Sequence, residues 1–180
     1  MRVALKPTMR ALTLGVRSLA LRRYRRMDPS DIRLWVTRLD TRRSLEEETA
    51  WERLRPLEEA VVPYLLEFFP TCRSREGRTA LVYHAIRYAR VSDAAFQLGI
   101  RALGDRSYMV RYRGCGLLAY SLRQDALPAL RELLVHEDQK TVKEAEAAID
   151  AITNRNHHFF FDRDHTGRAH WVVNPEDDER

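Results

Sequence analysis

Apolar and aromatic residues recur along this chain at a constant spacing of 32 residues. The spacing relates Leu66, Leu98 and Leu130; Ala85, Leu117 and Ile149; Tyr88 and Tyr120; and Val110 and Val142. The sequence around them has the 3.6-residue periodicity of amphipathic helices. A fixed period of this length in helical sequence is typical of stacked helix pairs, because one pair cannot bury its apolar face alone. The spacing therefore predicts an all-α fold built from a row of helix hairpins.

Short breaks at proline and aspartate residues delimit eight candidate helices, because these residue types start or stop helices. The chain has only seven glycines and seven prolines among 180 residues. An all-β sandwich or barrel needs a turn signal every ten residues or so, and this composition disfavours it. The helices are expected at residues 30–40, 45–54, 57–69, 75–90, 93–103, 107–122, 125–135 and 139–153.

Two segments, residues 105–123 and 136–152, share a local pattern. Each has an acidic residue, then a valine followed by arginine or lysine, then small residues at helical spacing. This pattern resembles the second helix of a HEAT-type repeat, and the resemblance covers about residues 57–153. It implies a right-handed α-α superhelix, a solenoid over residues 28–156 whose concave face is built mainly from second helices. Such repeat proteins usually bind partners rather than catalyse reactions.

The pattern changes at the C-terminal end. Residues 157–175 alternate apolar and polar side chains around a turn that contains Gly167. This alternation predicts a β-hairpin with strands near 158–162 and 168–173. A lone hairpin is marginally stable in water, so its apolar side is expected to cap the open end of the solenoid. The acidic residues 176–180 are expected to be a disordered tail.

The formal charge of +5 comes from the N-terminal end. Residues 1–27 hold eight basic side chains and no acidic one, so the rest of the chain carries a net charge of −3. Apolar residues at steps of three and four predict that this extension is a basic amphipathic helix. Two interpretations stay open: an organellar presequence or membrane-surface anchor, or an extension from a start upstream of Met27 with no function of its own.

Composition and motifs disfavour several classes of protein. Cys72 and Cys115 lie in no metal-ligand spacing, and such sparse cysteine favours a reduced, cytoplasmic compartment. No apolar run has the length of a membrane span. The C-terminal His158 and His170 could face each other, but no carboxylate or cysteine completes a zinc spacing. With no recognisable catalytic triad or phosphate loop, we expect neither an enzyme nor a cofactor.

Arginine and tyrosine gather in the central repeats. Residues 73–113 carry nine arginines against three acidic residues, and five of the seven tyrosines fall within or beside this block. The 32-residue register places several of them in one stripe, and core positions at Ala85 and Leu117 turn that stripe outward. Tyrosine and arginine are enriched at protein interfaces. The candidate partner-binding residues, called the Arg/Tyr stripe below, are His84, Arg87, Tyr88, Tyr112, Arg113 and Tyr120.

Two neighbouring residues are expected to be structural instead. Arg111 is expected to pair with an acidic residue of another repeat, and Tyr83 to lie in the core. Gly114 and Gly116 each cost a helix about 1 kcal/mol relative to alanine. Their presence predicts a close contact with another helix or with a partner.

Two functions are compatible with this pattern. The first is a non-enzymatic module that binds a protein with an acidic surface. Short bacterial HEAT-like proteins of this size resemble immunity proteins that block a cognate toxin, and the resemblance extends this expectation to an immunity role. The second is nucleic-acid binding, with arginines on phosphates and tyrosines stacked on bases. The net charge of −3 beyond the extension disfavours the second function.

Overall fold

The computed structural model describes residues 27–178, and it is helical in nearly every part that the repeat pattern predicted to be helical. The all-α prediction is confirmed for these residues. The predicted N-terminal extension lies outside the described residues, apart from Met27. The α-helices are α2 (Pro29–Thr37), α3 (Ser44–Leu54), α4 (Val62–Phe68), α5 (Arg75–Ala85), α6 (Asp93–Leu103), α7 (Tyr108–Ser121), α8 (Leu127–Glu132) and α9 (Gln139–Thr153).

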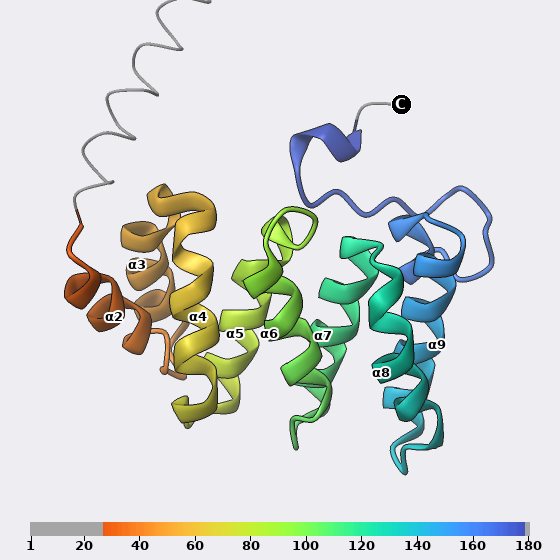
Figure 1. Ribbon diagram of the computed structural model, residues 1–180, viewed down its shortest axis with the longest axis horizontal. Coiled ribbons are helices and arrows are strands. Elements are labelled where there is room, and N and C mark those ends of the chain that lie inside the picture. Colours follow the sequence, from red (N-terminus) through yellow and green to blue (C-terminus); the bar gives the residue numbers. More distant parts are fainter. Residues whose placement is uncertain (1–26, 179–180) are drawn as a thin grey trace, which may run out of the picture.

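The helices lie in a row, from α2 at one end to α9 at the other (Figure 1). Consecutive helices pack in pairs: α2 with α3, α4 with α5, α6 with α7, and α8 with α9. The pairs form two layers, because α4 packs on α6 and α6 on α8, whereas α5 packs on α7 and α7 on α9. The buried leucines Leu65, Leu98, Leu117 and Leu130 lie between the layers in one continuous core. Within residues 27–178, no helix has both the length and the apolar character needed to cross a bilayer.

Local chemistry sets the helix boundaries. Asp28 accepts a hydrogen bond from the amide of Ser30 and precedes a proline, and Ser74 accepts one from Gly77. The helix expected at 57–69 is interrupted: a 3-10 segment, Arg55–Val61, comes before α4. Glu58 in this segment has a φ of 53°, which no α-helix accommodates.

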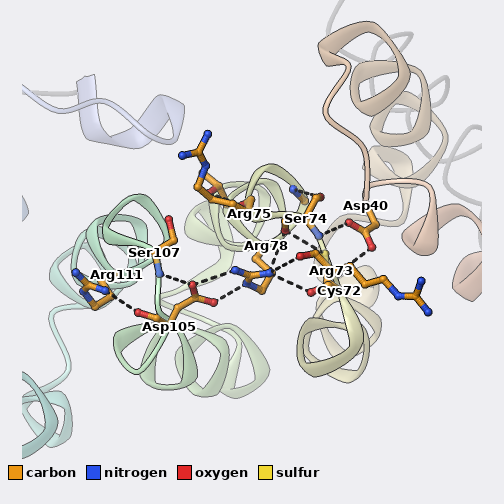
Figure 2. Close-up of polar contacts among 11 residues, drawn as sticks. Asp40, Cys72, Arg73, Ser74, Arg75, Arg78, Asp105, Ser107 and Arg111 are labelled. Carbon is orange, nitrogen blue, oxygen red and sulfur yellow. Dashed lines mark hydrogen bonds and ion pairs between the residues drawn. The ribbon is translucent and has the colours of Figure 1, made fainter.

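A chain of polar contacts joins successive helix pairs at one edge of the row (Figure 2). The Asp40 carboxylate accepts hydrogen bonds from the amides of Arg73 and Ser74. Arg78 then binds the carboxylate of Asp105, and Arg111 donates to the backbone oxygen of Asp105. Arg111 continues to the carboxylate of Asp138, the N-cap of α9, at 2.8 Å. The prediction that Arg111 pairs with an acidic residue of another repeat is therefore confirmed, and Arg78 has the equivalent role.

Gly114 allows α7 to approach α6 closely. A Cβ atom built on Gly114 would lie 2.9 Å from the Cβ of Ala102 and 3.1 Å from the backbone oxygen of Gly99. Gly116 faces the C-terminal segment instead, where a Cβ would lie 3.2 Å from the ring of Phe160. The predicted close contact with another helix is present at Gly114, whereas Gly116 contacts the chain's own residues after α9.

The predicted β-hairpin is wrong, because residues 27–178 contain no strand. Residues His157–Phe160 form a 3-10 turn, and the amides of Phe161 and Asp162 bond back to the carbonyl of His158. Phe160 is buried, and Trp171 packs beside it with ring centroids 5.6 Å apart. Both rings pack against α7 at Gly116, so tertiary packing overrides the alternating pattern.

Beyond α9 the chain turns back over the row (Figure 1). Residues 171–178, called the C-terminal segment below, pass over α7 and reach the 3-10 segment Ile86–Tyr88 that follows α5. They end in a 3-10 turn, Pro175–Asp178. The expectations of a cap at the open end and of a disordered tail are therefore wrong for the residues that the structure describes, because hydrogen bonds to α7 and to the end of α5 hold this segment.

Candidate functional site

The Arg/Tyr stripe lies along α5, Ile86–Tyr88 and α7, as the register predicts, but two of its members are buried. His84 is 8% exposed, stacks on Trp51 at 3.8 Å between ring centroids, and places Nε2 2.5 Å from a Glu47 carboxylate oxygen. Burial lowers the pKa of His84, although the hydrogen bond that its ring donates to the Glu47 carboxylate opposes the shift. Tyr120 is fully buried. The expectation that the whole stripe faces outward is wrong for these two residues.

Burial at Tyr120 results from the C-terminal segment, which covers this end of the stripe. The Tyr120 hydroxyl donates to the carboxylate of Asp177 at 2.8 Å and accepts a hydrogen bond from the Asn174 side chain. Arg90 reaches the same carboxylate at 2.9 Å and lies over the Tyr120 ring. Burial and the Asp177 hydrogen bond raise the pKa of the Tyr120 phenol. Sequence reasoning missed Asp177 and Arg90, since no local pattern signals a contact across 87 residues.

The middle of the stripe is partly covered. Tyr88 is half-buried against the core, which raises the pKa of its phenol, while the Arg87 side chain is exposed. The Tyr112 ring lies 5.9 Å from the ring of Phe160, close to the place where Trp171 packs over Gly116. The C-terminal residues thus cover part of the surface between α5 and α7 that the 32-residue register predicts to be exposed.

An open groove remains where the N-terminal ends of α3, α5 and α7 meet. It has a volume of about 530 Å³. Tyr83 and Met109 are its exposed apolar side chains, 53% and 38% accessible. The expectation that Tyr83 lies in the core is wrong, because its ring projects from α5 toward this groove. The full lining is Thr41, Arg42, Arg43, Ser44, Glu47, Arg75, Glu76, Thr79, Ala80, Tyr83, Met109 and Arg113.

The groove carries four arginines and two glutamates, so its net charge is positive. Both glutamates are engaged: Glu47 with His84, and Glu76 with Arg75. Among the described residues, Arg42 has no ion-pair partner within 4 Å. Its charge is therefore available to an anionic group that enters the groove.

Arg113 lies at the inner wall of the groove and keeps one donor unused. Its Nε atom is buried and has no hydrogen-bond acceptor among the described residues. The guanidinium carbon lies 4.9 Å from the ring centre of Tyr83 and 5.5 Å from that of Tyr112. Burying an unpaired donor costs about 1–3 kcal/mol, and more when the group is charged. The two rings flank the guanidinium without supplying an acceptor for Nε.

A smaller cavity of about 140 Å³ adjoins the groove and shares two of its lining residues. Arg113 and Tyr83 line one side of it, Arg87 another, and Trp171 and Val173 of the C-terminal segment a third. The open groove and the covered end of the stripe are therefore neighbouring parts of one basic surface, with Arg113 between them.

The C-terminal histidines do not assemble a metal site in the part of the chain that the structure describes. The rings of His158 and His170 lie 5.3 Å apart, but each has another contact: His158 Nδ1 accepts from the amide of Trp171, and His170 contacts the carbonyl of Gly167. The Asp162 carboxylate accepts hydrogen bonds from Thr166 and Gly167 and so stabilises the turn between them.

The chain matches no family model, no curated protein and no solved structure.

Proposed function

We propose that this protein is a non-enzymatic module that binds an acidic segment of a partner protein in the groove between α3, α5 and α7. The buried, unpaired Nε of Arg113 carries the proposal, because it lacks the acceptor that a carboxylate would supply. Arg42 and the exposed Tyr83 and Met109 support it. Arginine, tyrosine and methionine are the residue types enriched where proteins meet.

We further propose that the row of helix pairs is a right-handed HEAT-type superhelix. Two Arg–Asp bridges support this assignment: Arg78 with Asp105, and Arg111 with Asp138, each across 27 residues. Equivalent contacts at successive helix pairs are expected of a repeat protein, in which each unit packs only on its neighbours. In such a superhelix the groove belongs to the layer of second helices, α3, α5 and α7.

The resemblance to bacterial HEAT-like immunity proteins suggests one kind of partner, a toxin with an acidic surface. An immunity protein needs a binding surface and no catalytic group, which agrees with the chemistry of the groove. This assignment rests on analogy of fold, so the chemical class of the ligand is tested first.

The test is a display library of random 12-residue peptides selected against the full chain. We expect the selected peptides to be rich in aspartate and glutamate. Arg113→Ala and Arg42→Ala should each weaken their binding about tenfold, the loss of about 1.4 kcal/mol that one interfacial charge contact supplies. Arg101→Ala is the matched control, because Arg101 is exposed on α6 away from the groove.

The competing function is tested in the same assay. A labelled 20-nucleotide single strand that binds more tightly than the selected peptides, and loses affinity steeply as salt rises, would replace protein binding with nucleic-acid binding. Peptides without acidic residues, or peptides indifferent to both arginine variants, would contradict the groove as the site.

A further inference from the structure

The Asp177 side chain occupies a site built for a carboxylate. It is 1% exposed and accepts hydrogen bonds from Arg90 at 2.9 Å, from the Tyr120 hydroxyl at 2.8 Å, and from the amides of Val173 and Asn174 at 3.1 and 2.9 Å. Burial alone would raise the pKa of this carboxyl, but the hydrogen bonds outweigh it and lower the pKa. Two donors come from the helical face and two from the segment that carries the carboxylate.

The C-terminal segment contacts the helices through a small number of side chains. Trp171 packs edge-on against Tyr120 at 5.7 Å, and the Asn174 amide donates to the Arg87 carbonyl and to the Tyr120 hydroxyl. Asp177 supplies the third contact. An aromatic ring, an amide and a carboxylate, spaced three residues apart, are the features by which an extended peptide could be recognised on this surface.

Apart from Val173, which packs against the core, the other residues of the segment are mostly exposed. Val172 is 50% exposed, and Pro175, Glu176 and Asp178 are exposed as well. Within the described residues the segment pairs with no strand and packs in no α-helix. Segments with few buried apolar contacts open at a low free energy compared with the core. Opening would expose Arg90 and Tyr120 as a vacant pair of carboxylate donors beside Arg87.

We propose that Arg90 and Tyr120 form a second binding site for an acidic partner segment, and that the chain's own residues 171–178 fill it as a displaceable occupant. The proposal rests on the proposed function for the class of partner, an acidic segment. It adds the feature that the site recognises in that segment: a side-chain carboxylate six residues after an aromatic residue, as Asp177 follows Trp171. Charge supports this occupant, since Arg90 lies in the site, Arg87 and Arg113 line the adjoining cavity beside Trp171 and Val173, and an acidic segment already fits the site.

The C-terminal segment competes with any free peptide for the Arg90–Tyr120 site, because it is covalently attached to the chain. The tethered segment has a high effective concentration at the site, so a free peptide of equal quality binds weakly until the tethered one is released. A partner that also contacts the open groove through Arg113 gains affinity from both parts of the surface. The segment would thereby select partners that satisfy the groove and the Arg90–Tyr120 site together.

The test uses the full chain and a fluorescent peptide with the sequence of residues 169–178. Asp177→Asn should bind the peptide at least tenfold more tightly than the wild type, and amide exchange at Val173 and Asn174 should become at least tenfold faster. Asp178→Asn is the matched control, because it removes the neighbouring charge from an exposed side chain, and it should behave as the wild type. A peptide with asparagine in place of its Asp177 equivalent should bind at least tenfold more weakly, as should Arg90→Gln added to Asp177→Asn.

Equal affinity of the peptide for the wild type and Asp177→Asn would overturn the proposal, as would equal binding of the peptide that lacks the carboxylate. If Asp177→Asn does not fold, the wild type gives the answer: excess acidic peptide should accelerate exchange at Val173 and Asn174, and unchanged exchange overturns the proposal. A dimer of the wild type that exchanges C-terminal segments would assign the site to a second copy instead. Arg42→Ala should leave binding of this peptide unchanged, because Arg42 lines the groove and not the Arg90–Tyr120 site. The two proposals can therefore fail independently of each other.

Discussion

The Asp105 carboxylate holds the Arg78 guanidinium through two hydrogen bonds, from Nε at 2.6 Å and from Nη2 at 3.2 Å. The Arg78 and Asp105 side chains are 9% and 7% exposed. Arg78 also donates to the carbonyls of Cys72, Arg73 and Ser74, so one side chain joins the loop before α5 to the loop before α7. Successive helix pairs are therefore held by buried polar contacts in addition to the apolar core.

Removal of Arg78 should destabilise the fold strongly. Arg78→Ala leaves the Asp105 carboxylate buried without its partner, and we expect a loss of about 3–5 kcal/mol in the free energy of unfolding. Arg75→Ala is the control, because its pair with Glu76 is solvent-exposed and such pairs contribute about 0–1 kcal/mol. Urea denaturation measures both variants. A loss below 1 kcal/mol for Arg78→Ala would show that the bridge is dispensable.

Gly114→Ala should destabilise the protein although alanine favours helices. The added methyl gains about 1 kcal/mol in helix propensity but meets Ala102 and the backbone of Gly99, and overpacking costs about 1–3 kcal/mol. The difference predicts a net loss of up to about 2 kcal/mol, measured by urea denaturation. Gly104→Ala is the control: the nearest atom to its added carbon lies 3.9 Å away, so its effect should stay within about 0.5 kcal/mol.

Acid should weaken the fold through His157. Its Nε2 donates to the Trp171 carbonyl and its Nδ1 accepts from Arg90, so the neutral ring satisfies both contacts. Burial lowers the pKa of His157 below 6.5, and His158 and Arg90 lower it further, whereas Trp171 and Asp177 oppose the shift. The unfolded chain then binds more protons than the folded one, so stability is fully present above pH about 6.5 and falls as the pH drops through the folded pKa.

Urea titrations between pH 7.5 and 5 measure this dependence. One such histidine contributes a slope of at most about 1.4 kcal/mol per pH unit. His157→Gln should reduce the slope, since glutamine can keep a donor and an acceptor without titrating. His84 acts in the same direction, so part of the slope remains. His170→Gln is the control, because His170 is exposed, and it should leave the slope unchanged. A slope that His157→Gln does not change would show that other groups cause the acid sensitivity.

Both thiols should be unreactive in the folded protein. Cys72 and Cys115 are buried, and burial raises the pKa of each to about 12. Because the thiolate is the reacting form, Ellman's reagent should modify neither cysteine in native buffer and both in 6 M guanidinium chloride. Rapid modification of one thiol in native buffer would contradict the packing of α7 or of the loop before α5.

Much of the helical pattern could be predicted from sequence, and the site only in part. The 32-residue spacing and the proline and aspartate breaks locate the helices, because apolar periodicity and capping are local properties. The Arg111 bridge follows from the same repeat logic. The sequence predicts Tyr83 in the core and Tyr120 on the outer stripe, whereas Tyr83 is exposed and Tyr120 is buried. The register places a residue on a face of a helix but does not say what covers that face.

The sequence by itself determined the helices, their order and the basic character of the central pairs, all of which depend on residues close together in the chain. Tertiary structure alone decided which part of the Arg/Tyr stripe is open. Asp177 lies 57 residues from Tyr120 and 87 from Arg90, and it joins them only after the segment has turned back over α7. The segment follows this path because it buries large rings and one carboxylate against the packed helices. The surface that receives them exists only once the helices have packed, so the sequence pattern does not reveal it.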